Sequence, residues 1–126
     1  MATWDDVRRI ALALPESSEA TSYGQPAWKV RGKTFVWDRS ERTDDPSPVL
    51  GARVADEGAK AALIADDPGV YFTIPHFDGY AAVLVRLDAI PLDELTELIT
   101  EAWLLRAPKR VAAAYACAHG IERSPT

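Results

Sequence analysis

The segment 22–35 constrains the fold of this chain most, because its residues specify a β-hairpin. Core-facing and basic side chains alternate along it, in the order Trp28, Lys29, Val30 and Arg31. Gly32 then supplies the positive φ that a tight hairpin corner needs. The pattern predicts a strand at about 27–30, a two-residue corner and a returning strand at about 33–38. Such a hairpin has an aromatic side for a core and a basic side for solvent or an anion.

Length and composition indicate one globular domain, 1–126. Of its 126 residues, 48% are hydrophobic and 26% are charged, which is near the average of globular proteins. No apolar run approaches the ~20 residues that span a bilayer, so we expect no membrane insertion. Asp5 and Asp6 stand where a secretory signal would carry bases and an apolar block, so we predict a cytoplasmic protein.

The remaining hydrophobic patterns predict four helices and three more strands. Thr3 with Asp6 forms a capping pair for the first helix, and 16–26 and 39–47 are polar enough to predict loops. The helices are expected at about 4–14, 56–66, 91–107 and 109–119, and the strands at about 49–54, 70–73 and 80–87. Strands joined by short turns pair antiparallel. We therefore predict an α+β two-layer sandwich, an antiparallel sheet of about five strands covered by helices, in the order α-β-β-β-α-β-β-α-α.

Charge is distributed unevenly along the chain. The formal net charge of −5 argues against a general nucleic-acid coat, because such a protein is normally basic over a whole face. Bases nevertheless concentrate in two segments, 27–42 and 106–123: Lys29, Arg31, Lys33, Arg39 and Arg42 in the first, and Arg106, Lys109, Arg110 and Arg123 in the second. We expect any anion-binding site to be built from these two segments.

Several short motifs match a known family. They are Leu14-Pro15-Glu16, Ser22-Tyr23-Gly24-x-Pro26-x-Trp28, Val30-x-Gly32-Lys33-x-Phe35, Tyr71-Phe72-x-x-Pro75-His76-Phe77-x-Gly79-Tyr80 and Ala107-Pro108-Lys109-Arg110. In this order and spacing, over about residues 3–115, the chain resembles the MmcQ/YjbR family. The resemblance implies a CyaY-like fold, a compact antiparallel sheet covered by helices. It also implies DNA binding through hairpins, because members of that family are often labelled DNA-binding.

The basic hairpin is the first candidate site. Lys29, Arg31 and Lys33 would each neutralise a phosphate, and Arg39 and Arg42 would extend the row. Binding through four phosphates gives a slope of about −3.6 for log K against log salt. The alternative is a solvated sheet face whose bases pair with nearby acids.

Two further candidates lie in the second half of the chain. Lys109 and Arg110 begin the last helix, where free backbone N–H groups favour an anion, or else they pair with the Glu97–Glu101 face of the preceding helix. His76 would donate to a phosphate or act as a general base steered by Asp78. The alternative for His76 is a structural role in its turn.

Most other aromatic and reactive side chains are expected to be structural. Strand alternation directs most aromatic residues into the core, and an exposed Tyr23 or Trp37 would be the exception that offers a stacking platform. Cys117 is the only cysteine, and its alanine-rich helix predicts a small buried side chain. No phosphate-loop, dinucleotide-binding, nucleophile-elbow or zinc-protease motif occurs, so we predict a non-enzymatic protein with no cofactor and no metal.

These observations leave more than one function open. The first hypothesis is DNA binding through the phosphate backbone by Lys29, Arg31 and Lys33, helped by Lys109, Arg110 and His76. The alternative is an adaptor that binds a protein or a small anionic ligand in a groove lined by 16–26, the His76 turn and the start of the last helix. A third hypothesis is an enzyme that uses His76 and Asp78. Iron handling is a further alternative, because the acids near the first helix resemble the acidic ridge of frataxin-type proteins: Asp5, Asp6, Glu16 and Glu19.

Overall fold

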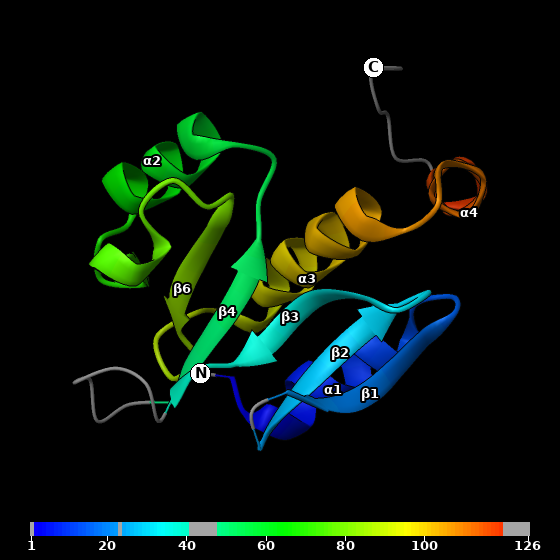
Figure 1. Cartoon of the computed structure of the whole chain (residues 1–126), viewed down its shortest axis with the longest axis horizontal. Coiled ribbons are helices and arrows are strands. Elements are labelled where there is room, and N and C mark those ends of the chain that lie inside the picture. The colour runs from blue at the N-terminus through cyan, green and yellow to red at the C-terminus, as the bar shows by residue number, and fades with distance from the viewer. Residues whose placement is uncertain (1, 23, 41–47, 120–126) are drawn as a thin grey trace.

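The computed structural model describes residues 2–22, 24–40 and 48–119, apart from the side chains of Ser22 and His76. The helices are α1 (Trp4–Ala13), α2 (Glu57–Asp66), α3 (Leu92–Arg106) and α4 (Lys109–Ala118), with a short 3₁₀ turn η2 at Pro75–Phe77 (Figure 1). The strands are β1 (Ser17–Ser22), β2 (Gln25–Val30), β3 (Lys33–Asp38), β4 (Val49–Arg53), β5 (Tyr71–Phe72) and β6 (Ala82–Arg86). Within the described residues, no helix has both the length and the apolar character to cross a membrane.

The strands form one antiparallel sheet in the order β1-β2-β3-β4-β6-β5, which confirms the predicted α+β class. The prediction of a loop at 16–26 is wrong, because β1 and the start of β2 occupy this segment, with Ser17 opposite Val30. The sequence of β1, Ser-Ser-Glu-Ala-Thr-Ser, has no apolar alternation. The strand β1 lies at the edge of the sheet, where it is held by backbone pairing with β2. Its side chains therefore carry no pattern from which a strand could be predicted.

Two helices cover one face of the sheet, which we call the covered face. Figure 1 shows α1 and α3 behind the sheet, and they contact β1, β2, β3 and β4. The predicted capping pair starts α1: the Thr3 hydroxyl accepts from the Asp6 backbone N–H (3.3 Å), and the Asp6 carboxylate accepts from the Thr3 backbone N–H (2.9 Å). This cap sets the start of α1 so that Val7, Ile10 and Ala11 face the sheet.

The hydrophobic core lies between the covered face and these helices. Its fully buried side chains include Trp28, Val30, Val36, Leu50, Val83, Val85, Ile99 and Trp103. Burying one large aliphatic side chain contributes roughly 1.5–3 kcal/mol. The covered face therefore supplies most of the driving force for folding.

No described helix lies over β1–β4 on the other side of the sheet, which we call the open face (Figure 1). Its one large aromatic side chain on these strands is Trp37, which lies against Gly51: a Cβ at Gly51 would be 2.2 Å from Trp37 Cε2. The η2 turn packs beside it, with the Phe77 ring centroid 6.2 Å from that of Trp37. Among the described elements, η2 therefore lies against this face beside Trp37.

Two predictions about individual side chains are wrong. Cys117 is exposed, because α4 turns Ala112 and Ala116 inward and Cys117 projects about 100° away from them. The strand predicted at 80–87 was expected to begin at Tyr80, but β6 begins at Ala82, and Tyr80 lies in the preceding turn, where it is 56% exposed.

Candidate nucleic-acid interface

The corner between β2 and β3 has the predicted form. Arg31 and Gly32 both have positive φ, 51° and 82°, as in the two-residue turns whose twist matches a hairpin. Lys29 lies on the open face opposite Thr34, and Lys33 is exposed beside the corner, opposite Val30. The hairpin therefore presents its cations on the open face and at its tip.

Arg31 is the one base of this hairpin with an acidic partner in the described residues. Its guanidinium Nε donates to the Glu16 carboxylate, and this bond raises the pKa of Arg31. Lys29 and Lys33 form no ion pair with any described residue. Of Lys29, Arg31 and Lys33, only Arg31 is thus neutralised by an acid among the described residues.

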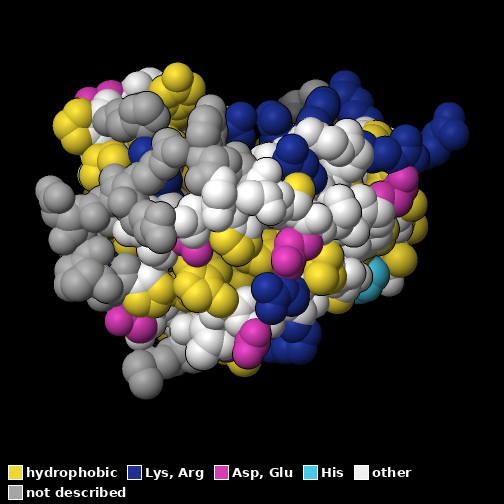
Figure 2. All heavy atoms as spheres, turned by 60° about the horizontal axis from the view of Figure 1, so that its bottom comes forward, with side chains coloured by type: hydrophobic (Ala, Val, Ile, Leu, Met, Phe, Trp, Pro, Cys, Tyr) yellow, Lys and Arg dark blue, Asp and Glu magenta, His cyan; other side chains and the backbone are white. Residues whose placement is uncertain are grey.

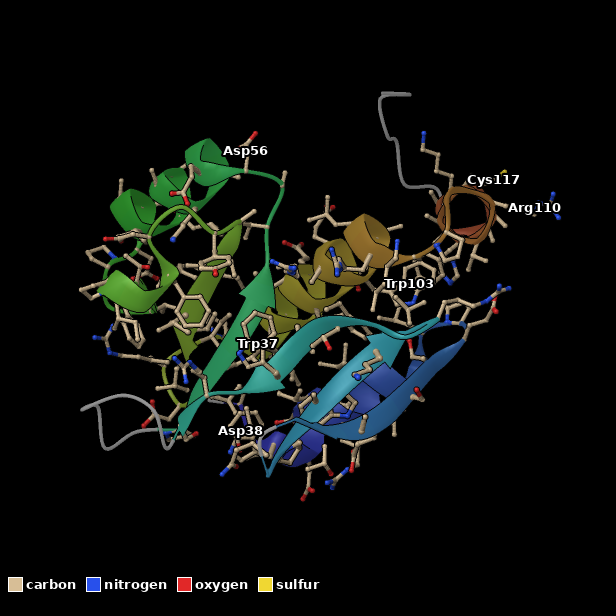
Figure 3. All side chains as sticks on the ribbon, in the orientation of Figure 1. Trp37, Asp38, Asp56, Trp103, Arg110 and Cys117 are labelled. Carbon is tan, nitrogen blue, oxygen red and sulfur yellow. The ribbon has the colours of Figure 1, made fainter. Side chains whose placement is uncertain are left out.

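The two bases at the start of α4 are also exposed. Lys109 and Arg110 occupy the first turn after Pro108, and neither pairs with an acid in the part of the chain described here. Arg110 points away from α4 into solvent (Figure 3). The alternative, in which these bases pair with the Glu97–Glu101 face of α3, is therefore not formed among the described residues.

Trp103 holds these two basic segments at one end of the molecule. Its indole Nε1 donates to the Pro15 carbonyl (3.0 Å), and its ring meets Tyr115 of α4 edge-on, with centroids 5.0 Å apart. Pro15 precedes Glu16, the partner of Arg31 at the hairpin tip. Figure 3 shows Trp103 between the end of α3, α4 and the β2–β3 corner. Residues far apart in sequence are thereby brought together through one buried indole.

Two arginines that were not in the predicted site adjoin it. Arg53 ends β4 and Arg106 ends α3, and the pKa of Arg53 is lowered by burial and then by the nearby Arg106 charge. The Nε atom of Arg106 is buried without a hydrogen-bond partner among the described residues. The sequence places Arg106 in a basic segment, but nothing in it shows that a strand end and a helix end meet.

Together these residues form what we call the basic surface: Lys29, Arg31, Lys33, Arg53, Arg106, Lys109 and Arg110. Figure 2 shows Lys and Arg side chains gathered towards the upper right of the molecule, the side on which Figure 1 shows α4 and the β2–β3 corner. A positive surface of this kind attracts phosphate groups by screened Coulomb interactions.

Other predicted contributors lie elsewhere. The η2 turn that contains His76 lies beside α2, where Lys60 donates to the Phe77 carbonyl (2.7 Å), and α2 and α4 are at opposite ends in Figure 1. The His76 side chain, Tyr23 and Arg42 lie outside the described residues. Arg39 does not extend the exposed row, because it is only 7% exposed and its guanidinium carbon lies 4.9 Å from the centre of the Phe77 ring.

A separate groove of about 750 Å³ lies between α2 and α3. Its apolar lining includes Ala59, Leu63 and Leu98, and its charged lining residues are Arg53, Asp66, Glu94, Glu97 and Glu101. Tyr71 donates to Glu94 there (2.7 Å), and burial followed by this bond raises the pKa of Tyr71. This groove is lined neither by 16–26 nor by η2 or α4, so it is a different groove from the one that the adaptor hypothesis predicts.

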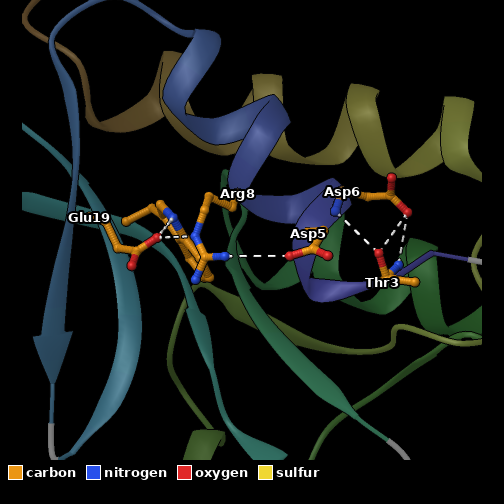
Figure 4. A network of polar contacts seen from close by, with 6 residues as sticks. Thr3, Asp5, Asp6, Arg8 and Glu19 are labelled. Carbon is orange, nitrogen blue, oxygen red and sulfur yellow. Dashed lines mark hydrogen bonds and ion pairs between the residues drawn. The ribbon is translucent and has the colours of Figure 1, made fainter.

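The acids near α1 are all engaged by bases (Figure 4). Glu19 accepts from Arg8 Nε (2.7 Å) and from Trp28 Nε1 (3.1 Å), and the bond from Arg8 lowers the pKa of Glu19. Asp5 pairs with Arg8, Asp6 with Arg9 and Glu16 with Arg31. Among the described residues no group of three His, Cys, Asp or Glu side chains is arranged to hold a metal ion. The structure therefore gives no support to the iron-handling hypothesis.

Comparison with protein families agrees with this architecture. The family model described as YjbR matches residues 12–105. The uncharacterized protein Mb2600 of Mycobacterium bovis is 51% identical over 127 aligned residues, which cover 91% of this chain and 96% of that protein. The uncharacterized protein Rv2570 of Mycobacterium tuberculosis shows the same identity and coverage.

A solved structure shares the fold. The crystal structure of Deinococcus radiodurans protein DR2400, described as a DUF419 domain, matches with a TM-score of 0.72 over 99% of this chain and 93% of that one. The sequences are 23% identical, so the match concerns the fold alone.

Proposed function

This chain belongs to the YjbR family, and we propose that it binds DNA through the phosphate backbone, as a binding protein rather than an enzyme. The observation that carries the proposal is the basic surface. The net charge of the chain is −5, yet Lys29, Lys33, Lys109 and Arg110 have no acidic partner in the described residues. Unpaired cations held together in an acidic protein mark the place where an external anion fits best.

The arrangement favours contacts to phosphates over the reading of base edges. The cations come from a hairpin tip, a strand end and two helix ends, and no described helix projects a row of Arg, Asn or Gln as a recognition helix does. Contacts to phosphates position a protein on nucleic acid but carry no sequence information. We therefore expect binding that depends strongly on salt and weakly on sequence.

The adaptor hypothesis gains nothing from the groove between α2 and α3. A small anionic ligand would meet Asp66, Glu94, Glu97 and Glu101 there, with Arg53 as the single opposing charge in the lining. The negative charges of these four acids would repel an anionic ligand in the groove. An anion is better accommodated on the basic surface.

Fluorescence anisotropy with labelled duplex and single-stranded DNA, at low and at moderate salt, tests the proposal. Four phosphate contacts predict a slope of about −3.6 for log K against log salt. Failure to bind either DNA more tightly than about 10⁻⁴ M at low salt, the weak end of non-specific binding, would overturn the proposal.

Two arginine variants distinguish the effect of charge on the basic surface from the effect of net charge on DNA affinity. Arg110→Gln removes one cation of the basic surface, and we expect weaker binding and a salt slope smaller by about 0.9. Arg9→Gln is the control, because it makes the same change in net charge on α1, where Arg9 already pairs with Asp6. Equal losses in the two variants would show that the basic surface is not the contact site.

A further inference from the structure

The open face carries an aromatic platform beside the basic surface, and we propose that it selects single-stranded nucleic acid, with bases stacked on Trp37 and Tyr80 and phosphates at Lys29 and Arg53. This inference rests on the proposed function, because the same cations hold the phosphates. It adds a class of ligand, unpaired bases, that contacts to phosphates alone would not select.

Trp37 is held in a stacking position by the absence of a side chain at Gly51. Its indole occupies the space directly above that residue, where a Cβ would lie 2.2–2.6 Å from three of its atoms. Trp37 is half-buried, in contrast to Trp28 on the covered face, which is 1% exposed. Figure 3 shows Trp37 in front of β4, on the side of the sheet without a covering helix. The indole thus packs against β4 at Gly51 and remains partly exposed.

The η2 turn extends this platform with a second ring. The Phe77 ring lies 6.2 Å from that of Trp37, and Tyr80 meets Phe77 edge-on at the same separation. Lys60, itself 3% exposed, donates to the carbonyls of Phe77 (2.7 Å) and Tyr80 (3.3 Å), and thereby fixes the turn against α2. Tyr80 is 56% exposed, so its ring is available to a ligand.

Cations flank the platform on one side. Trp37 pairs with Ala27 of β2 and with Gly51 of β4, and Lys29 and Arg53 follow those partners by two residues. Lys29 lies about 7 Å along β2 beyond Ala27, and Arg53 lies about 7 Å along β4 beyond Gly51, although the bulge between Trp28 and Lys29 places Lys29 opposite Thr34 of β3. The two strands that carry the cations are about 10 Å apart. A strand of nucleic acid whose bases lie on Trp37 and Tyr80 can therefore run its backbone along these cations.

Single-stranded nucleic acid fits this arrangement better than a duplex does. The bases of a duplex already stack on one another, whereas unpaired bases stack on aromatic side chains with an effect of about 5- to 150-fold in affinity for each base. The platform consists of rings with no base-specific donors or acceptors arranged around them, so we expect little dependence on sequence. Stacking and phosphate contacts are common to DNA and RNA, so we expect similar affinity for both.

The test compares three labelled ligands of about 15 nucleotides: single-stranded DNA, single-stranded RNA and duplex DNA. The wild-type chain is expected to bind both single strands more tightly than the duplex. Tyr80→Leu and Trp37→Leu should each weaken single-strand binding by about 5- to 150-fold and leave duplex affinity and the salt slope unchanged. Tyr80→Phe keeps an aromatic ring and should retain the wild-type preference.

The ratio of single-strand to duplex affinity distinguishes two causes of weaker binding in a variant. Loss of a stacking contact lowers this ratio, whereas loss of folding weakens the binding of every ligand. Tyr80→Leu replaces an exposed side chain and leaves the fold intact even if Trp37→Leu does not. Duplex binding that equals single-strand binding, with no change of the ratio in either variant, would overturn this inference and leave the proposed function standing. No binding of any ligand by the wild-type chain would overturn both.

Discussion

The two faces of the sheet use charge and aromatic side chains in opposite ways. On the covered face, Trp28 is buried and donates to Glu19, which also accepts from Arg8. On the open face, Trp37 is half-buried and Lys29 has no partner among the described residues. The covered face stabilises the fold through buried apolar area and through hydrogen bonds such as these. The open face can therefore carry side chains that folding does not require.

Replacing a tryptophan on each face gives the largest expected effects on stability. Trp28→Ala should lower the free energy of unfolding by about 3–5 kcal/mol, because it empties a buried site and removes a hydrogen bond to Glu19. Trp37→Ala removes a half-buried ring and should cost roughly 1–2 kcal/mol. Urea denaturation of both variants measures the difference. Equal losses would contradict the contrast between the two faces.

Gly51 tests how tightly Trp37 packs on the open face. Gly51→Ala places a Cβ 2.2 Å from Trp37 Cε2, and the indole must move, which should cost about 1–3 kcal/mol. Adding Trp37→Ala to this variant removes the clash, so the two substitutions should be clearly non-additive. Gly69→Ala is the matched control, because the nearest atom to its Cβ would be 3.4 Å away, an ordinary contact. Additive effects of the two substitutions in the double variant would show that Trp37 does not occupy this position in solution.

Local sequence signals predicted the elements that local interactions determine. The Thr3–Asp6 capping box and the Arg31–Gly32 corner appear as expected, because each depends on residues that are neighbours in the chain. The strand β1 was missed because its stability comes from pairing with β2 and not from its own side chains. Cys117 was expected to be buried, but the inward face of α4 is set by contact with α3, which composition does not reveal.

The candidate site was predictable in its residues and not in its geometry. Lys29, Lys33, Lys109 and Arg110 could be named from charge alone, whereas their proximity depends on the contacts that Trp103 makes with Pro15 and Tyr115. The approach of Arg53 to Arg106 could not be predicted either, because like charges meet only where packing places a strand end beside a helix end. The pairing of Arg31 with Glu16 required both residues to be located in space.

The charges of the covered face give a smaller effect that depends on pH. The bond from Arg8 lowers the pKa of Glu19 in the folded state, so its stabilising effect is present above the unfolded pKa of about 4.3 and is lost as the pH falls through the lowered folded value. Glu19→Gln should cost about 0.5–1 kcal/mol near neutral pH, since the pair is partly exposed. The deficit relative to wild type should shrink in acid, as measured by urea denaturation across this range.

The control for this pH dependence is Asp88→Asn. Asp88 is exposed and has no ion pair in the described chain, so its substitution should change stability by less than about 0.5 kcal/mol at each pH. A deficit for Glu19→Gln that persists unchanged below the folded pKa would mean that the charge of Glu19 does not stabilise this face.

The smallest effect on stability is expected for a substitution of Glu16, the partner of Arg31 in the basic surface. Unlike the loss of a cation at Arg110, this substitution should strengthen DNA binding. Glu16→Gln should change the free energy of unfolding by less than about 1 kcal/mol, because an exposed ion pair contributes little. It releases Arg31, so DNA binding should become tighter and the salt slope steeper by about 0.9, the effect of one more phosphate contact. Asp88→Asn is the control, because it makes the same change in net charge away from this pair.

If Glu16→Gln and Asp88→Asn strengthen DNA binding equally, the gain comes from net charge. If only Glu16→Gln strengthens it, Glu16 restrains a cation of the basic surface, and that surface is where the charge left unpaired by folding meets the ligand.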